Sequence, residues 1–207
     1  MAEGVRAVLT RSDVVAWMEK ERIQERLIVT PLLEPDRAIG ACGVDLRLGT
    51  EFIVMKKEAF PGLDFQTSSD MYRQLDRYRG RIVRNYGDKF VMHPGQLVLG
   101  STLEYVQIPP GLMAYVIGKS SWGRMGLIIA TATKVDPGFR GCITLEIINE
   151  GEVPLALYPG LPIAQLVLHA TSGMADVYDG RYRCPTGPEF PKFDPDDESV
   201  KFWTKEQ

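Results

Sequence analysis

The chain has 207 residues, 44% of them hydrophobic, and a formal net charge of −3. This length allows one sizeable core, so we expect a single domain over residues 1–207. The acidic balance excludes a global basic surface for nucleic acid or for a membrane. No apolar stretch approaches the roughly 20 residues that span a bilayer, and the N-terminus lacks the apolar run of a secretory signal. We therefore expect a cytoplasmic protein without nucleic-acid or membrane partners.

Cysteine and histidine are too sparse for the common disulfide and zinc patterns. Cys42, Cys142 and Cys184 lie far apart and form no C-x-x-C pair, which argues against a disulfide framework. Zinc-dependent nucleobase deaminases need an H-x-E and a P-C-x-x-C pattern, and the chain has neither. His93, in an H-P-G turn, and His169, at the end of an apolar run, are predicted to be structural.

A short helix is predicted near the N-terminus, from Thr10 to about Lys20. Thr10 or Ser12 suits its N-cap, and Asp13 is favourable in its first turn. Its apolar face is formed by Val14, Trp17 and Met18.

Short strands are predicted for most of the remaining chain. Residues 26–35 form an extended piece that two prolines interrupt. Residues 43–49 alternate between apolar and charged positions, which predicts a half-buried strand, and residues 51–55 form another. The polar residues 57–87 are predicted to be a solvated, partly irregular insertion; a basic binding patch is the weaker alternative, because carboxylates are interspersed. Further strands are predicted at 96–99, 103–108, 112–117, 142–148 and 163–168.

Four Pro-Gly turns separate these strands: HPGQ, PPGL, DPGF and YPGL. Proline at the second position and glycine at the third fit a type II turn. Many short strands with regular turn signals predict a β-sandwich or a barrel. After Ala170 the composition changes to glycine, proline and charge, so residues 171–207 are predicted to be a flexible C-terminal tail or lid.

Residues 118–126, GKSSWGRMG, combine hydroxyl groups with positive charge. Ser120 and Ser121 suit the cap of a short helix, and the N–H groups at a helix start attract phosphate. Lys119 and Arg124 add cations, and arginine binds phosphate through two parallel hydrogen bonds. A capped surface turn with two solvated cations is the structural alternative.

Two carboxylates follow, one in a turn and one in a strand. Asp136 begins the D-P-G-F turn, where turn chemistry alone accounts for an aspartate. Accepting a hydrogen bond from a sugar hydroxyl, or polarising water, is the functional alternative. Glu146 shares one strand face with Cys142, Thr144 and Ile148. Desolvation there would favour the neutral carboxyl, which suits a general acid/base; an outward-facing glutamate is the alternative.

These motifs occur together in a known family. GKSSWGR resembles the G-R-S-S-x-x-R motif of the dCTP deaminases, which share a superfamily with the trimeric dUTPases. DPGFRGCITLEIIN resembles their D-P-G-x-x-G-x-x-x-L-E-x-x-N segment, and GVDLRLG, VMHPGQ and PLALYPGLPIAQL follow in the expected order. The resemblance covers about residues 9–188. It implies a mainly β protein, a distorted dUTPase-like β-barrel with a short N-terminal helix and a C-terminal lid, assembled as a homotrimer with active sites between subunits.

The resemblance also implies a reaction. It is the zinc-independent hydrolysis of dCTP to dUTP and ammonia, in dUTP and dTTP precursor metabolism, with Mg²⁺ bound through the triphosphate and no direct protein ligand to the metal. dTTP is a candidate inhibitor. The alternatives are a bifunctional enzyme that continues to dUMP, and a catalytically altered homologue that only binds nucleotide.

Roles for single residues follow from the resemblance. Glu146 matches the general acid/base that activates the attacking water. Arg124 and Ser120 match residues that approach the reacting base and water from a neighbouring subunit. The remaining residues match substrate-binding positions. Lys119, Ser121 and Gln165 match phosphate-binding residues, Asp136 matches the carboxylate near the deoxyribose, and Ala132 matches the residue that orients the exocyclic amine. Arg181 and Tyr182 match a tail segment that folds over the triphosphate.

The chain differs from the family pattern at three points. The segment between Arg124 and Asp136 is one residue shorter, with Ile129 where a histidine is expected. Lys119 replaces the usual arginine, and Pro185 stands near the position of a tail glutamine. We expect these differences to affect the base pocket and the closing of the tail.

Overall fold

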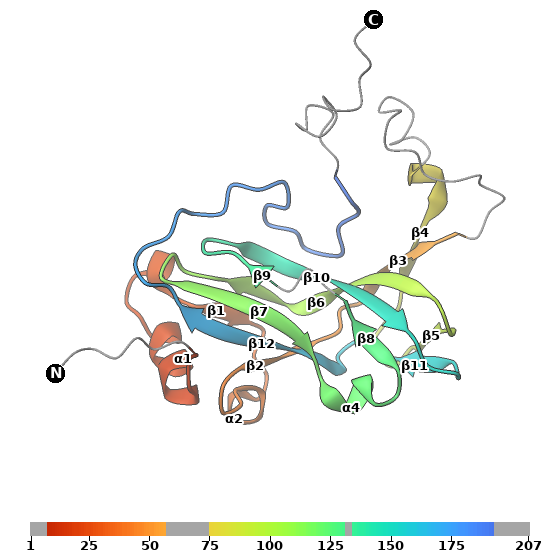
Figure 1. The fold of residues 1–207 in the computed structure, drawn as a ribbon, viewed down its shortest axis with the longest axis horizontal. Coiled ribbons are helices and arrows are strands. Elements are labelled where there is room, and N and C mark those ends of the chain that lie inside the picture. Colours follow the sequence, from red (N-terminus) through yellow and green to blue (C-terminus); the bar gives the residue numbers. More distant parts are fainter. Residues whose placement is uncertain (1–7, 57–74, 131–133, 193–207) are drawn as a thin grey trace, which may run out of the picture.

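The computed structural model describes residues 8–56, 75–130 and 134–192 and has a mainly β fold, as predicted (Figure 1). The strands are β1 (Ile28–Thr30), β2 (Val44–Arg47), β3 (Glu51–Met55), β4 (Arg79–Val83), β5 (Phe90–Met92), β6 (Leu97–Gln107), β7 (Leu112–Gly118), β8 (Leu127–Ile129), β9 (Lys134–Val135), β10 (Arg140–Asn149), β11 (Leu155–Leu157) and β12 (Pro162–Ala170). The helices are α1 (Arg11–Met18), the 3₁₀ turn η1 (Ile23–Glu25), α2 (Pro35–Ala38) and α4 (Ser120–Gly123). Within these described ranges, none of the helices has the length and apolar character that a bilayer crossing requires.

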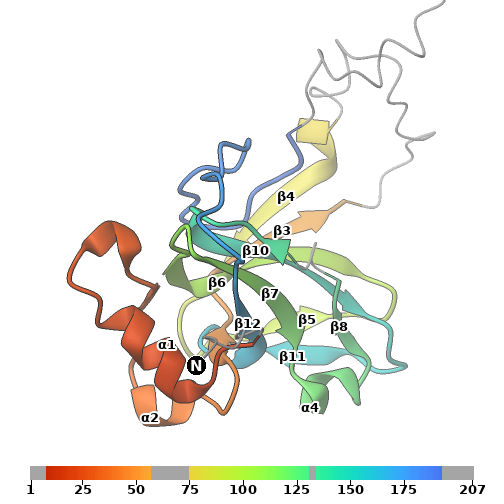
Figure 2. The same cartoon turned by 60° about the vertical axis from the view of Figure 1, so that its left-hand side comes forward.

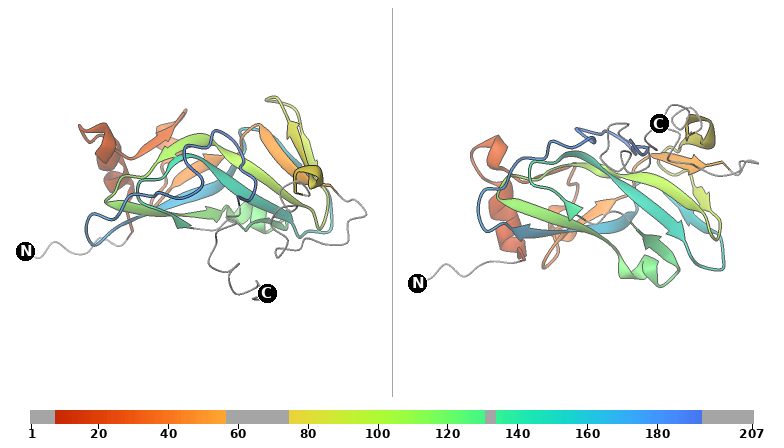
Figure 3. Two further views of the ribbon diagram at one scale, coloured as in Figure 1. Left: turned by 90° about the horizontal axis from the view of Figure 1, so that it is seen from above. Right: turned by 45° about the horizontal axis from the view of Figure 1, so that its top comes forward.

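Within the described ranges the strands form three antiparallel sheets. The largest has the order β4-β3-β6-β10-β8, with β1 also paired to β6. The four-stranded sheet has the order β2-β12-β7-β9, and β5 pairs with β11. Helices α1 and α2 lie at one end of the molecule, and β3 and β4 extend toward the opposite end (Figures 1 and 2). The segment after β12 runs back over β10 (Figure 3).

The main hydrophobic core contains residues of both larger sheets, and a smaller cluster lies around Ile53 and Phe190. Strand β10 shows how the sequence builds the main core. Leu145 and Ile147 are fully buried, whereas Thr144, Glu146 and Ile148 on the other face are only half-buried. Successive side chains of a strand point to opposite faces, so β10 contributes apolar residues to the core and polar residues to the outside. Full burial of each such aliphatic side chain stabilises the fold by about 1.5–3 kcal/mol.

A buried ion pair joins the two larger sheets. Glu104 of β6 is fully buried and accepts hydrogen bonds from the Nε of Arg47 at 2.6 Å and from its backbone N–H at 2.8 Å. The Nη2 of Arg47 also donates to the carbonyl of Pro31 at 2.7 Å. A buried carboxylate costs several kcal/mol unless it is paired and hydrogen-bonded, so this geometry ties β2 to β6.

The predicted N-terminal helix is confirmed as α1, with narrower bounds. Thr10 is its N-cap: the Thr10 hydroxyl donates to the Asp13 carboxylate at 2.7 Å, and the Thr10 backbone N–H reaches the same oxygen at 3.1 Å. Ser12 is therefore inside the helix and is not its cap. Val14 is completely buried, so the helix packs on the core as expected.

One prediction about strands is wrong. Residues 96–99 and 103–108 were expected as separate strands, but β6 runs without a break from Leu97 to Gln107. The polar residues between them remain in the strand because the Thr102 hydroxyl donates to the Glu104 carbonyl at 2.7 Å and accepts from the Ile143 N–H at 2.9 Å. Strand β4, which pairs with β3, lies in the region predicted to be a partly irregular insertion. The first part of that region, 57–74, lies outside the described residues.

Three of the four Pro-Gly turns have the backbone that a type II turn requires. Gly95, Gly138 and Gly160 have φ of +70°, +82° and +89°. Gly111, in PPGL, is not in that region, although its turn is closed by the Leu112 N–H to the Pro109 carbonyl at 3.0 Å. The type II prediction is therefore wrong for PPGL.

Candidate active site

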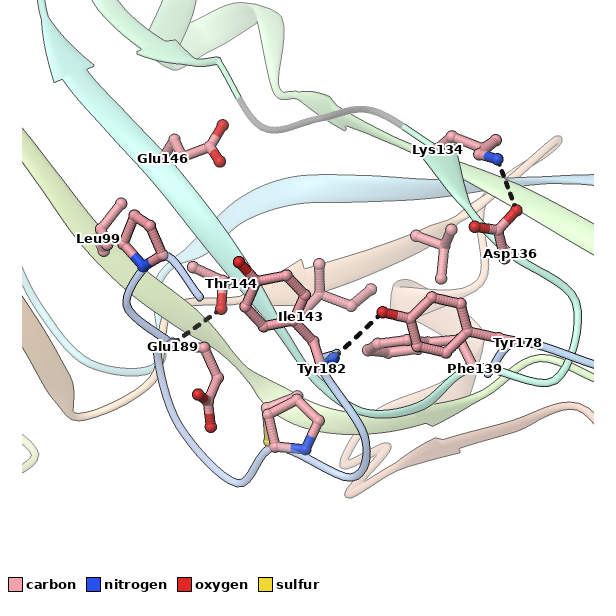
Figure 4. A pocket seen from close by; sticks show the side chains of 14 residues that line it. Leu99, Lys134, Asp136, Phe139, Ile143, Thr144, Glu146, Tyr178, Tyr182 and Glu189 are labelled. Carbon is pink, nitrogen blue, oxygen red and sulfur yellow. Dashed lines mark hydrogen bonds and ion pairs between the residues drawn. The ribbon is translucent and has the colours of Figure 1, made fainter. Parts of the chain in front are cut away.

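A pocket of about 500 Å³ lies between strand β10, the turn that follows β9 and the C-terminal segment (Figure 4). Its β10 wall presents Thr144 and Glu146. Glu146 pairs with Leu99 of β6, and its carbonyl accepts the Ala130 N–H at 2.8 Å, so its backbone is held from both sides. The sequence prediction that Thr144 and Glu146 share one face of the strand is confirmed.

The second wall carries an ion pair. The Nζ of Lys134 lies 2.7 Å from the Oδ1 of Asp136, and the hydrogen bond and charge of Asp136 raise the pKa of Lys134. The Asp136 carbonyl accepts the Phe139 N–H at 3.1 Å, which closes the predicted turn. Lys134 was not among the predicted residues. Its position two residues before Asp136, on a short strand, was the signal that could have indicated it.

The third wall belongs to the C-terminal segment. The Tyr178 N–H donates to the Pro137 carbonyl at 2.8 Å, and the rings of Tyr178 and Phe139 lie 6.0 Å apart between centroids. Further along, the Glu189 N–H donates to the Thr144 hydroxyl at 3.0 Å. The segment up to residue 192 therefore rests on the turn and on β10 of its own chain.

Of the two predicted tail residues, only Tyr182 lines the pocket. The Tyr182 hydroxyl accepts the Lys192 N–H at 3.1 Å, and the Arg181 Nη1 donates to the Lys192 carbonyl at 3.0 Å. These bonds close a loop within the tail, with Tyr182 turned toward β10 (Figure 4). The predicted flexibility of residues 171–207 stays a prediction.

The lining of this pocket is acidic. It contains three carboxylates, Asp136, Glu146 and Glu189, and Lys134 is the only cation among the described lining residues. Glu189 is paired outside the lining with the Nζ of Lys192 at 2.7 Å. Such a surface repels polyanions and accepts hydrogen-bond donors. It suits the neutral, polar part of a ligand rather than a phosphate chain.

A second polar cluster joins three neighbouring strands. The Nζ of Lys119, at the end of β7, lies 2.5 Å from the Oδ2 of Asp45 on β2. The Nε2 of Gln165 on β12 donates to the other Asp45 oxygen at 2.9 Å. The structure thus brings together two predicted phosphate-binding residues. Asp45 was not predicted as a site residue; the alternation of GVDLRLG placed it on the outer strand face.

Helix α4 follows directly after Lys119. The prediction that Ser120 or Ser121 caps this helix is wrong, because Lys119 is the N-cap, with an extended backbone (φ −74°, ψ 133°) and no side-chain cap. Both serines lie in the first turn, and with Arg124 they are exposed. The indole of Trp122 donates to the Pro162 carbonyl at 2.8 Å, which holds α4 against β12.

The predicted site residues therefore fall into separate groups. The pocket contains Glu146, Asp136 and Tyr182, whereas Lys119 and Gln165 meet at Asp45. Ser120, Ser121 and Arg124 do not line the pocket of their own chain. Ala132 lies outside the described residues. Across the part of the chain that the structure describes, no group of three or more His, Cys, Asp or Glu side chains could hold a metal ion.

The fold and site define a mainly β protein with an acidic, partly aromatic pocket and a separate lysine–glutamine cluster. The model of the dCTP deaminase-like family matches residues 11–171. The chain belongs to this family, and the resemblance drawn from its motifs is confirmed.

Curated relatives match over most of their length. A protein of Natronomonas pharaonis named dCTP deaminase is 39% identical over 189 residues, covering 88% of this chain and 92% of the relative. One of Haloarcula marismortui with the same name is 38% identical, covering 92% and 97%. A Dictyoglomus thermophilum protein named "dCTP deaminase, dUMP-forming" is 39% identical, covering 82% and 83%.

A solved structure supports the fold. The 2'-deoxycytidine 5'-triphosphate deaminase of Agrobacterium tumefaciens superposes with a TM-score of 0.59 at 20% identity, over 81% of this chain. The chain spans about half the length of that solved chain, 49%. At this identity the likeness shows the fold alone.

Proposed function

We propose that this chain is an enzyme that hydrolyses dCTP to dUTP and ammonia and so supplies precursors for dUTP and dTTP metabolism. The observation that carries the proposal is the half-buried Glu146 carboxylate on β10, inside a pocket that also contains Asp136 and Tyr182. Relatives named dCTP deaminase, at 38–39% identity over most of this chain, give the reaction. We expect the enzyme to act in the cytoplasm.

Glu146 is the general acid/base in this mechanism. Its carboxylate accepts a proton from a water molecule while the water oxygen attacks C4 of the cytosine ring. The same group gives this proton to the ring nitrogen N3, where it remains in the uracil product. It then takes the second proton from the C4 hydroxyl and passes it to the amine, which leaves as ammonia as the C4 carbonyl forms. A positioned carboxylate of this kind contributes about 10²–10⁴-fold to the rate.

Asp136 is proposed to accept a hydrogen bond from the deoxyribose 3′-hydroxyl. Its Oδ1 is held by Lys134, and within the described residues no donor occupies the second carboxylate oxygen, which is available to a ligand donor. The aromatic rings of Phe139 and Tyr178 lie beside it and offer an apolar surface for the sugar. We propose that the segment of Ala132 orients the exocyclic amine.

The triphosphate is proposed to lie away from the acidic pocket, at Lys119, Ser121 and Gln165. Lysine and a carboxamide N–H both donate to phosphate oxygens. Mg²⁺ enters with the nucleotide, bound to the phosphates of the substrate, and the reaction uses no zinc. Arg181 and Tyr182 are proposed to close over the triphosphate once it is bound.

A homotrimer with active sites between subunits completes the site. Ser120, in the first turn of α4, and Arg124, at the C-cap of this helix, are exposed and do not line the pocket of their own chain, so we propose that they reach the pocket of a neighbouring subunit. Ile117, Met125 and Ile128, near α4, are 42%, 53% and 41% exposed, which supports a covered surface there. We also propose that the sheets around the shared core form a distorted barrel.

The test is incubation of the purified protein with dCTP and Mg²⁺, followed by separation of dCTP, dUTP and dUMP. We expect dUTP to accumulate together with one equivalent of ammonia. Conversion to dUMP and pyrophosphate would show instead the reaction named for the Dictyoglomus thermophilum relative. Nucleotide binding without turnover would identify a catalytically altered homologue and refute the enzyme. Turnover that requires stoichiometric zinc would refute the mechanism.

A further inference from the structure

Both proposed phosphate-binding side chains already have an anionic partner in the free chain. Asp45 accepts from the Lys119 ammonium with one carboxylate oxygen, at 2.5 Å, and from the Gln165 carboxamide with the other, at 2.9 Å. A carboxylate that receives a cation and an amide N–H in this way occupies the place that a phosphate oxygen would take. The lysine and the glutamine of the cluster therefore already have a hydrogen-bond acceptor before any nucleotide binds.

The backbone fixes this arrangement without a ligand. Asp45 of β2 stands directly opposite Gln165 of β12 in the antiparallel register. The Lys119 N–H donates to the Ile163 carbonyl at 3.1 Å, which brings the end of β7 to the same edge of β12. Three neighbouring strands thus place the side chains of Asp45, Gln165 and Lys119 side by side. Strand pairing alone keeps these side chains close together.

The ion pair also neutralises the charge of the cluster. The side chains of Lys119 and Asp45 are 25% and 23% exposed, so solvent screens their attraction only in part. Arg47, two residues along β2 on the same face, is committed to the buried Glu104 and to the Pro31 carbonyl. An approaching triphosphate therefore meets a lysine whose charge Asp45 already compensates.

We propose that Asp45 is an internal counter-ion of the triphosphate site, which the phosphate chain of the nucleotide displaces from Lys119. This inference rests on the proposed function, because it takes Lys119 and Gln165 as phosphate-binding groups. Asp45 repels the incoming anion and also holds Lys119 in place. The repulsion is the larger effect, because a triphosphate carries several charges and the ordering concerns one lysine side chain. Mg²⁺ bound to the phosphates reduces the repulsion.

The test is the affinity of inorganic tripolyphosphate for the full-length protein, measured by calorimetry in the presence of a chelator. The Asp45→Asn variant keeps one oxygen for Gln165, removes the negative charge and replaces the oxygen that accepts from Lys119 by an amide NH2 group. We expect it to bind tripolyphosphate about threefold to tenfold more tightly than the unmodified chain, with a smaller difference when Mg²⁺ is added. The matched control is Glu25→Gln, which removes one carboxylate charge from the Arg22–Glu25 pair and should leave the affinity unchanged.

A double-mutant cycle separates this inference from the proposed function. Lys119→Met should weaken tripolyphosphate binding. Asp45→Asn should strengthen binding again in that background, but by a smaller factor than in the unmodified chain, because the repulsion between Asp45 and the phosphates remains while the ion pair with Lys119 is gone. If Lys119→Met leaves binding unchanged, the phosphate assignment itself fails. If Lys119→Met weakens binding and Asp45→Asn weakens it as well, with an unchanged melting temperature, the counter-ion is refuted and the phosphate assignment stands.

Discussion

The two polar regions of this molecule differ in charge and in what covers them. The pocket on β10 presents three carboxylates and one cation, and the C-terminal segment of the same chain covers it. The Lys119 cluster is electrically balanced by Asp45 and lies at the end of the β2-β12-β7 strands, beside the exposed α4. The difference separates the group proposed for proton transfer from the groups proposed for phosphate. Loss of the proton-transfer group Glu146 in the first region should therefore act on kcat, and changes in the second region should act on KM.

The largest expected effect is that of Glu146→Gln. The carboxamide fills the same space but cannot accept a proton from water, so deamination should fall by about 10²–10⁴-fold while the Kd for dCTP stays within about threefold. Ammonia release and equilibrium binding measure the two quantities. Glu150→Gln, an exposed neighbour on the same stretch, is the control and should keep full activity. Near-normal turnover in Glu146→Gln would refute its role.

Arg124→Ala should also remove most activity, although Arg124 does not line the pocket of its own chain. It is exposed at the C-cap of α4. Mixing inactive Arg124→Ala with inactive Glu146→Gln under conditions of subunit exchange should restore part of the activity, because some mixed sites contain both native residues. Restoration would be measured as dUTP formation after mixing. If mixed oligomers form and no activity returns, sites shared between subunits are excluded.

Lys119→Met is expected to raise the KM for dCTP by about tenfold and to change kcat by less than about threefold. The substitution removes a cation from the phosphate region and leaves the β10 pocket intact. Steady-state kinetics with dCTP measures both constants. A fall in kcat at unchanged KM would instead show that Lys119 takes part in the chemical step. It would refute the assignment of proton transfer and phosphate binding to two separate regions.

The smallest effect is expected for Lys134→Met. Without its ion pair Asp136 is no longer held, so the KM for dCTP should rise by about twofold to fivefold, because an exposed pair contributes modestly. The preference for dCTP over 2′,3′-dideoxy-CTP should narrow, as measured by kcat/KM for each. Asp136 raises the pKa of Lys134, so the lysine remains a cation at neutral pH and the pair weakens only in alkaline solution.

The control for this variant is Lys192→Met, which breaks a lysine–carboxylate pair of the same 2.7 Å length at the other side of the pocket. It should leave the preference between the two nucleotides unchanged. An equal narrowing in both variants would show that general charge, and not the hold on Asp136, determines sugar recognition.

Local patterns were enough to predict several elements. The alternation of β10 placed Glu146 opposite the core, the threonine and aspartate of α1 indicated its start, and three Pro-Gly turns have the predicted left-handed glycine. These succeed because strand pleat, helix capping and turn geometry depend on neighbours in the chain. The predicted cap of α4 was wrong because the backbone of Lys119 is extended and hydrogen-bonded to Ile163 of β12. This contact determines where the helix begins.

The sequence by itself determined the class of the fold, the family and the carboxylate proposed for the chemistry, since periodicity and motif order are written along the chain. Only the tertiary structure decided which side chains meet. Asp45 lies 74 residues from Lys119 and 120 from Gln165 in the sequence, yet strand pairing brings all three together. Register in a sheet depends on contacts between distant segments, and so the pairing of Asp45 with the phosphate-binding side chains, and of the tail with Thr144, could not be predicted from any local pattern.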